Sequence, residues 1–134
     1  MNAAGPRFEA LDFLYTPSRD VASDRDALVE VLGGRQIFAI EDGATRVAAV
    51  ELSGPPAILL TNHLEGERPI LVYRVADLSA TVAGLEAAGW DRPRSLEIPQ
   101  GPCSSFATPG GHRFAVYELT RPGVADHFAG RTDF

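Results

Sequence analysis

The chain has 134 residues and a formal net charge of −6, from 12 basic and 18 acidic residues. Its length predicts one domain, and a hydrophobic content of 45% is enough for a core without disulfides or a structural metal. The acidic balance argues against nucleic acid as a partner, because binding a phosphate backbone needs a basic face. It argues equally against an anionic membrane surface.

Signals for export or membrane insertion do not stand out in the sequence. No apolar run approaches the ~20 residues that a membrane-spanning helix needs. Residues 1–13 lack the apolar core after positive charge that is typical of a secretory signal. Cys103 is the only cysteine, so no internal disulfide can form, and we interpret it as a structural thiol. Together these features predict a cytoplasmic location.

The first half of the chain predicts a strand, a helix and three further strands. Residues 8–17 are apolar and aromatic and end at a proline, which indicates a strand. Asp20 then begins a helix over 20–32, which ends at a glycine pair. The apolar residues of this helix recur at helical spacing: Val21, Leu28 and Leu32. Three strands separated by turn residues follow, and they cover 35–40, 45–52 and 57–62.

The same order restarts after a polar, linker-like stretch. A strand over 70–75 is followed by Asp77, which begins a helix over 78–88. Three further strands are predicted, at 94–98, 104–108 and 112–119. The sequence therefore predicts an α+β fold of two βαβββ modules in one domain, with the helices outside a curved mixed sheet. Its parts are module one (about 8–62), the linker (63–69), module two (about 70–120) and a C-terminal tail (121–134), of which the polar segment 125–134 is expected to be poorly ordered.

Short motifs within this order carry a resemblance to a known family. An aspartate begins each helix, as Asp20-Val21 and Asp77-Leu78, and the helices end at Leu32-Gly33 and Ala88-Gly89. The segment 106–114 (FATPGGHRF) is similar to a closing turn of the same family, with Thr108 and Gly110 in place of its two acids. Over roughly residues 8–120 the chain resembles the vicinal oxygen chelate superfamily, which includes glyoxalase I, extradiol dioxygenases and bleomycin-resistance proteins.

The resemblance implies where a metal would be held. Enzymes of the family bind a divalent ion with one ligand from each of four strands, and the ion polarises the substrate. Counting from the motifs, the corresponding positions are Phe13, Leu59, Leu71 (or Ile70) and Ala115. All of these side chains are hydrocarbon and offer no donor atom, so we expect no metal and no cofactor. Shifting the assigned positions by one residue along the strands would bring in only one metal-binding side chain, that of Asp12. Such a shift would also move every side chain of the strand to the other face of the sheet.

What remains is a predicted cup with apolar walls and a few polar groups. Residues at spacing two share a strand face, and the resemblance places that face around a central cavity. The candidate ligand-binding residues are Phe13, Tyr15, Leu59, Thr61, Leu71, Tyr73, Arg113, Ala115 and Tyr117. The sequence leaves open whether this cup is an open pocket or filled core. The histidines are interpreted as a solvated linker residue, a residue at the start of a strand and a tail residue: His63, His112 and His127.

Three functions are compatible with these features. The favoured one is a metal-free protein of the glyoxalase/bleomycin-resistance type that binds an aromatic or amphipathic small molecule. The alternative is a lyase, isomerase or dioxygenase of the same superfamily, with a displaced metal or with acid–base chemistry by tyrosines or His63. The third is an interaction module without a ligand. No catalytic residue is assigned, and the resemblance implies a homodimer.

Overall fold

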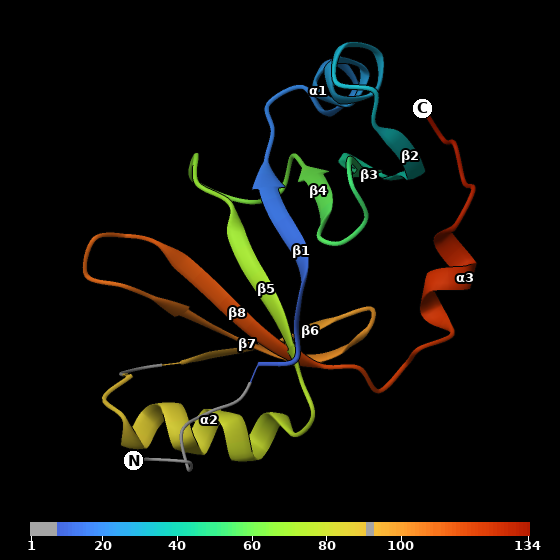
Figure 1. Cartoon of the computed structure of the whole chain (residues 1–134). Helices are drawn as coiled ribbons and strands as arrows, with labels where there is room; N and C mark the ends of the chain where they lie inside the picture. Colours follow the sequence, from blue (N-terminus) through green and yellow to red (C-terminus); the bar gives the residue numbers. More distant parts are fainter. Residues whose placement is uncertain (1–7, 91–92) are drawn as a thin grey trace.

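The computed structural model describes residues 8–90 and 93–134, and its strands and helices follow the predicted order (Figure 1). The elements of the described residues are β1 (Ala10–Pro17), α1 (Val21–Asp26), η1 (Ala27–Val31), β2 (Arg35–Asp42), β3 (Thr45–Glu51), β4 (Ala57–Thr61), β5 (Ile70–Val75), α2 (Leu78–Ala87), β6 (Arg94–Ile98), β7 (Gly101–Ala107), β8 (Arg113–Glu118) and α3 (Val124–Phe128). Both βαβββ modules are therefore present, which confirms the predicted α+β fold.

All eight strands belong to one mixed sheet in the order β2-β3-β4-β1-β5-β8-β7-β6. Within each module the first strand pairs in parallel with the last, β1 with β4 and β5 with β8. The modules join where β1 and β5 pair antiparallel, and these strands lie side by side in the middle of Figure 1. The centre of the sheet is therefore built from the four strands on which the resemblance places its ligands.

Helices α1 and α2 cover the same face of this sheet. Val21 of α1 packs on Ala39, Ala48 and Leu60, with Ile58 beside them. In module two, three α2 residues pack in one cluster with buried residues of β5, β7 and β8: Leu78, Val82 and Leu85 with Val75, Phe106 and Val116. Because neighbouring residues of a strand point to opposite faces, the residues between these core positions point away from α1 and α2. We call that opposite side the cup face.

Both helices begin at the predicted aspartates. The side chain of Asp20 accepts a hydrogen bond from the backbone N–H of Ser23, at 3.1 Å. The side chain of Asp77 accepts one from the backbone N–H of Ala80, at 3.0 Å. Each bond satisfies a backbone donor that the first helical turn leaves without a partner.

The end of the first helix differs from the prediction. The helix continues into η1, a π-helical segment, and the Leu32 N–H bonds back five residues to the Ala27 carbonyl. The wider turn inserts an additional residue and changes the phase of the apolar stripe. Leu32 is consequently 61% exposed, whereas Val21 of the same apolar repeat is buried.

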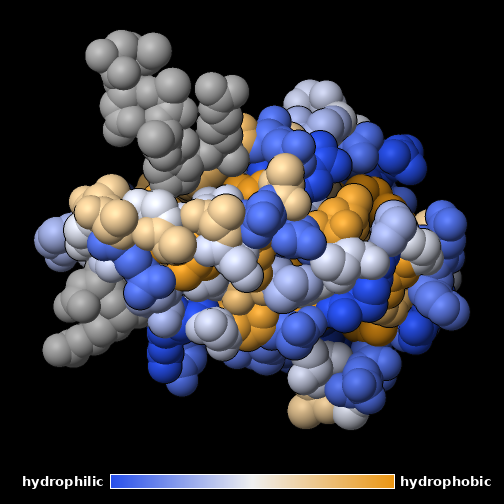
Figure 2. Space-filling model, turned by 90° about the horizontal axis from the view of Figure 1, so that it is seen from below, coloured by the Kyte–Doolittle hydropathy of each residue, from blue (hydrophilic) through white to orange (hydrophobic). Residues whose placement is uncertain are grey.

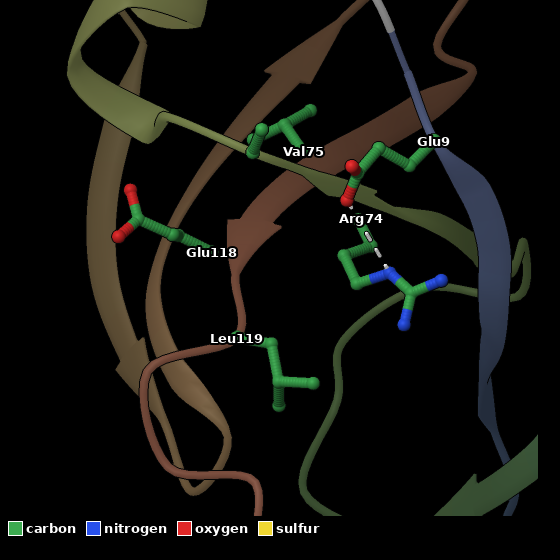
Figure 3. Close-up of a pocket in the computed structure, with 6 residues that line it drawn as sticks. Glu9, Arg74, Val75, Glu118 and Leu119 are labelled. Carbon is green, nitrogen blue, oxygen red and sulfur yellow. Dashed lines mark ion pairs between the residues drawn. The ribbon is translucent and has the colours of Figure 1, made fainter.

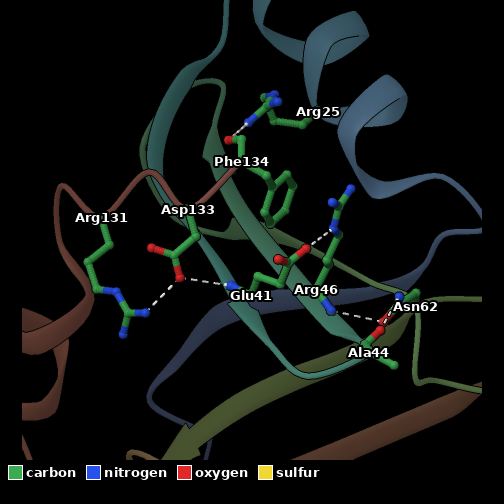
Figure 4. Close-up of polar contacts among 8 residues, drawn as sticks. All are labelled: Arg25, Glu41, Ala44, Arg46, Asn62, Arg131, Asp133 and Phe134. Carbon is green, nitrogen blue, oxygen red and sulfur yellow. Dashed lines mark hydrogen bonds and ion pairs between the residues drawn. The ribbon is translucent and has the colours of Figure 1, made fainter.

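The C-terminal tail is ordered, contrary to the expectation. It forms α3 and then runs parallel to the edge strand β2, where the Ala39 N–H donates to the Arg131 carbonyl and the Asp133 N–H donates to the Ala39 carbonyl. Phe134 packs against the α1 core, with the guanidinium carbons of Arg25 and Arg46 5.3 and 4.7 Å from its ring centre. Figure 4 shows the Phe134 ring between Arg25 and Arg46, and the bond from Arg25 to the Phe134 backbone oxygen. An edge strand leaves backbone groups unpaired, and the tail satisfies part of them.

Among the described residues, no helix combines the length and the hydropathy that crossing a membrane requires. In the space-filling view from the α2 side, hydrophobic residues lie in separate small areas between hydrophilic ones (Figure 2).

Candidate functional site

The strand register defines the floor of the cup face. One row crosses four strands as Ala57, Phe13, Val72 and Ala115. The neighbouring row crosses the same strands as Leu59, Tyr15, Ile70 and Arg113. Side chains of paired residues stand on the same side of a sheet, so the two rows form one surface. The middle of this surface is apolar.

The structure brings most of the predicted site residues to this face. They are Phe13, Tyr15, Leu59, Thr61, Arg113, Ala115 and Tyr117. The rings of Phe13 and Tyr117 are in contact, with centroids 5.8 Å apart.

Leu71 and Tyr73 lie on the opposite face, so their placement in the cup was wrong. Leu71 pairs with Leu14, and Tyr73 packs with the α2 core cluster, its ring centroid 5.0 Å from that of Phe8. The register shows that Ile70, the other option for the third position, faces the cup. The prediction assigned Tyr73 to the cup because it lies two residues after Leu71 on the same side of the strand. A register error of one residue at Leu71 therefore also put Tyr73 on the wrong face.

The four positions at which the resemblance places metal ligands do not fit a metal ion. They are Phe13, Leu59, Ile70 and Ala115, whose side chains contain only carbon and hydrogen. A divalent cation needs oxygen, nitrogen or thiolate donors. Within residues 8–90 and 93–134, no group of three or more His, Cys, Asp or Glu side chains is arranged to hold an ion. We therefore derive no chemistry through a metal at these positions.

A polar group lies at one end of the floor, where β1 and β4 end. The Tyr15 hydroxyl is 2.8 Å from His63 Nε2, and His63 Nδ1 is 2.5 Å from the Thr61 hydroxyl oxygen. Burial raises the pKa of the Tyr15 phenol, so this residue stays protonated at neutral pH. His63 is exposed, as expected of a linker residue, but its ring bonds two cup residues. Its exposure in the loop agrees with its interpretation as a solvated linker residue, and the contacts with Tyr15 and Thr61 are additional to that interpretation.

Arg113 fixes the loop that carries His63. Its guanidinium donates to the Glu65 carbonyl at 2.9 Å and also to the Arg68 carbonyl. Gly66 in this loop has a φ of 86°, a backbone conformation that glycine adopts without strain. Loop 63–69 is therefore held against the first residue of β8.

A second polar group lies at the other end of the floor. The Tyr117 hydroxyl donates to Asp12 at 2.5 Å, and Arg74 Nε lies 3.7 Å from the same carboxylate and 3.6 Å from that of Glu9. Burial and the neighbouring Asp12 carboxylate both raise the pKa of Tyr117 well above its usual value. The sequence did not identify Asp12 as a cup residue, because strand alternation with Phe13 puts it on the other face. A β-bulge between Leu11 and Phe13 turns its side chain toward the cup.

Two open pockets adjoin these polar groups. One of about 570 Å³ lies beside the His63 end and is lined by Pro17, Ser18, Arg19, Asn62, Leu64, Gly66 and Glu67. The other, of about 460 Å³, lies at the Arg74 end and is lined by Glu9, Arg74, Val75, Ala76, Glu118 and Leu119 (Figure 3). In Figure 3 the Arg74 guanidinium lies beside the Glu9 carboxylate. The residues that line these pockets lie beside the two polar groups, and Ala115 and Val72 of the floor between them are buried.

Comparison with known proteins identifies the fold. No family model matches the sequence, and no curated protein matches it. Among solved structures, methylmalonyl-CoA epimerase from Mycobacterium tuberculosis is similar over 93% of this chain and 97% of its own, at 18% identity and a TM-score of 0.70. A glyoxalase/bleomycin resistance protein/dioxygenase superfamily member from Vibrio splendidus is similar over 84% and 99%, at 17% identity and a TM-score of 0.57.

A catechol 2,3-dioxygenase is similar over 84% of this chain but only 42% of its own, at 15% identity and a TM-score of 0.62. This chain therefore corresponds to less than half of that dioxygenase. The sheet order, the two modules and these similarities together show that the chain has the fold of the vicinal oxygen chelate superfamily. At these levels of identity the similarity describes the fold, and the activity has to be argued from the site.

Proposed function

We propose that this chain is a metal-free small-molecule-binding protein of the glyoxalase/bleomycin-resistance type. Its ligand is an aromatic or amphipathic compound that lies on the cup face. The observation that carries the proposal is the apolar floor of Phe13, Leu59, Ile70 and Ala115 between two polar groups. These are the positions at which the resemblance places metal ligands. Small-molecule sites commonly combine apolar walls with a few placed polar groups.

The spacing of the two polar groups along β1 sets an upper limit on the length of a ligand between them. Asp12 and Tyr15 mark the two polar ends and are three residues apart on β1. A strand rises about 3.3 Å per residue, so roughly 10 Å separates the ends. The Phe13 ring lies between them and is partly exposed, which leaves an aromatic surface for stacking.

Calorimetric titration with planar aromatic probes, including 2-naphthalenemethanol and 2-naphthoate, tests this function. We expect at least one probe to bind in the presence of EDTA, with unchanged affinity after Mg²⁺ or Zn²⁺ is added. Leu59→Trp fills the floor and should weaken binding at least about tenfold, whereas Leu52→Trp, at a residue 43% exposed outside the cup, should not. Binding only with added metal, or by no probe, would contradict the proposal.

A second candidate is a metal-independent isomerase or lyase, and the Tyr15–His63–Thr61 contacts favour it. A histidine hydrogen-bonded to a phenol and a hydroxyl is an arrangement that can move a proton. This function predicts turnover of a bound carbon acid, detected as exchange of its acidic hydrogen for deuterium in D₂O. The exchange should be lost in His63→Ala. Binding without exchange would favour the first function.

Homodimerisation and a cytoplasmic location remain predictions. Light scattering of the purified chain tests the first, with twice the monomer mass as the expected result. Fractionation of the cells that produce it tests the second.

A further inference from the structure

The hydrogen bonds around His63 determine where its ring proton lies. Thr61 is fully buried. Its hydroxyl oxygen already accepts from the His63 backbone N–H at 3.4 Å. A buried hydroxyl hydrogen without an acceptor is costly. Among the hydrogen bonds of the described residues, the shortest from this hydroxyl is to His63 Nδ1, at 2.5 Å, which favours His63 over the neighbouring Tyr15 oxygen as its acceptor.

The donor in the Thr61–His63 bond also determines the donor in the bond between His63 and Tyr15. If the Thr61 hydroxyl donates to Nδ1, the neutral imidazole carries its proton on Nε2. Nε2 then donates to the Tyr15 oxygen, 2.8 Å away. The hydrogen of the Tyr15 hydroxyl is consequently left over, and Tyr15 stands on the cup face beside Leu59 and Ile70. It is available to an acceptor atom on a ligand.

The charges around this end favour a negative acceptor. Arg113 and Arg68 donate to backbone carbonyls, and in the described residues neither lies within ion-pair distance of a carboxylate. Arg19 pairs at the surface with Glu67, at 3.5 Å, and Glu65 is exposed. Two guanidiniums around the loop, those of Arg113 and Arg68, therefore have no carboxylate partner among the described residues, although the whole chain is acidic. At the Asp12 end carboxylates are in excess, because Asp12 and Glu9 both lie near the single guanidinium of Arg74.

We infer that the Tyr15–His63–Thr61 group is the recognition site for an acidic oxygen on an aromatic ligand, a carboxylate or a phenolate. Thr61 holds His63 in the Nε2–H form, His63 donates to Tyr15, and the Tyr15 hydroxyl donates to the ligand oxygen. This inference rests on the proposed function and adds the chemical class and the orientation of the ligand. The ring system lies over Phe13 and Leu59, with its acidic group at the His63 end and the rest directed toward Asp12.

Two measurements on the full chain test the inference. Nitrogen-15 NMR of the imidazole rings should show His63 as the Nε2–H tautomer at pH 8, and Thr61→Val should shift its population toward Nδ1–H. In titrations, 2-naphthoate should bind at least about tenfold more tightly than 2-naphthalenemethanol, which has the same rings and no charge. Tyr15→Phe and His63→Ala should abolish this preference, and His127→Ala, at an exposed α3 residue, should retain it.

The outcomes separate this inference from the function on which it rests. If both probes bind equally and the two site variants change nothing, the inference is overturned and the binding function stands. An Nδ1–H tautomer at His63 would overturn the proposed relay in the same way. If neither probe nor any other planar aromatic compound binds, the binding function itself fails, and the inference fails with it.

Discussion

The Tyr117 hydroxyl donates a 2.5 Å hydrogen bond to Asp12, and this bond connects β8 to the bulge of β1 across β5. The two residues are 105 positions apart in the chain. Their contact places a carboxylate and a phenol at one end of an otherwise apolar floor. It also ties module two to the first strand of module one.

This bond predicts a loss of stability at high pH. An unfolded tyrosine ionises near pH 10, whereas burial and the Asp12 carboxylate raise the pKa of folded Tyr117 above that value. Between these two values the folded state holds the proton that the unfolded state releases, so the free energy of unfolding falls as pH rises. Urea denaturation from pH 8 to 11.5 measures this slope. It should be smaller in Tyr117→Phe, and an equal slope in that variant would contradict the assignment.

Gly101 is predicted to tolerate no side chain. A Cβ at this position would lie 2.0 Å from the Glu118 carbonyl oxygen, because β7 begins against the end of β8. We expect Gly101→Ala to reduce the free energy of unfolding by about 2 kcal/mol or more. Gly123→Ala is the matched control, since nothing lies within 4 Å of its added Cβ. Equal stability of the two variants in chemical denaturation would show that β7 and β8 do not approach so closely.

Phe134 should contribute measurably to the stability of module one. Its ring lies between Arg25 and Arg46 on the α1 core, and Arg25 also donates to its backbone oxygen at 2.9 Å. Phe134→Ala should cost about 2 kcal/mol through lost apolar burial. In Thr132→Ala the exposed side chain is lost but the backbone pairing remains, so the change should stay within about 0.5 kcal/mol. An unchanged free energy of unfolding in Phe134→Ala would mean that the tail does not pack against the α1 core.

Cys103 should be unreactive in the folded protein. The side chain is buried between β6 and β8, and burial raises the pKa of its thiol to about 11. The thiolate is the reactive form, so little of it is present at pH 8. An aromatic disulfide reagent should label the thiol slowly in buffer and rapidly in 8 M urea. Rapid labelling in buffer would contradict this burial.

Local signals were sufficient to predict the fold. Asp20 and Asp77 mark the helix starts, because a side-chain cap needs only neighbouring residues. The turn at Gly43, with a φ of 60°, separates β2 from β3 as the Asp-Gly pair predicts. The repeated order then leads to the correct sheet, because each module repeats the same local pattern.

The site depended on features that no local signal contains. Whether Ile70 or Leu71 faces the cup is decided by pairing with β1, and Asp12 reaches the cup through a bulge in that pairing. The contact of His63 with Tyr15 joins residues 48 positions apart. Leu32 does not lie on the buried side of the helix with Val21, because the π-helical turn before it alters the helical period. These are properties of the assembled sheet or of one irregular turn.

The position of a bound probe tests the central claim most directly. A crystal structure with 2-naphthoate, grown with EDTA, should show the rings over Phe13 and Leu59 and the carboxylate at the Tyr15 hydroxyl. The four positions Phe13, Leu59, Ile70 and Ala115 should contact only carbon atoms of the probe. Rings bound outside the cup face would contradict the account. A divalent ion held on this floor when the protein is prepared with metal would contradict it as well.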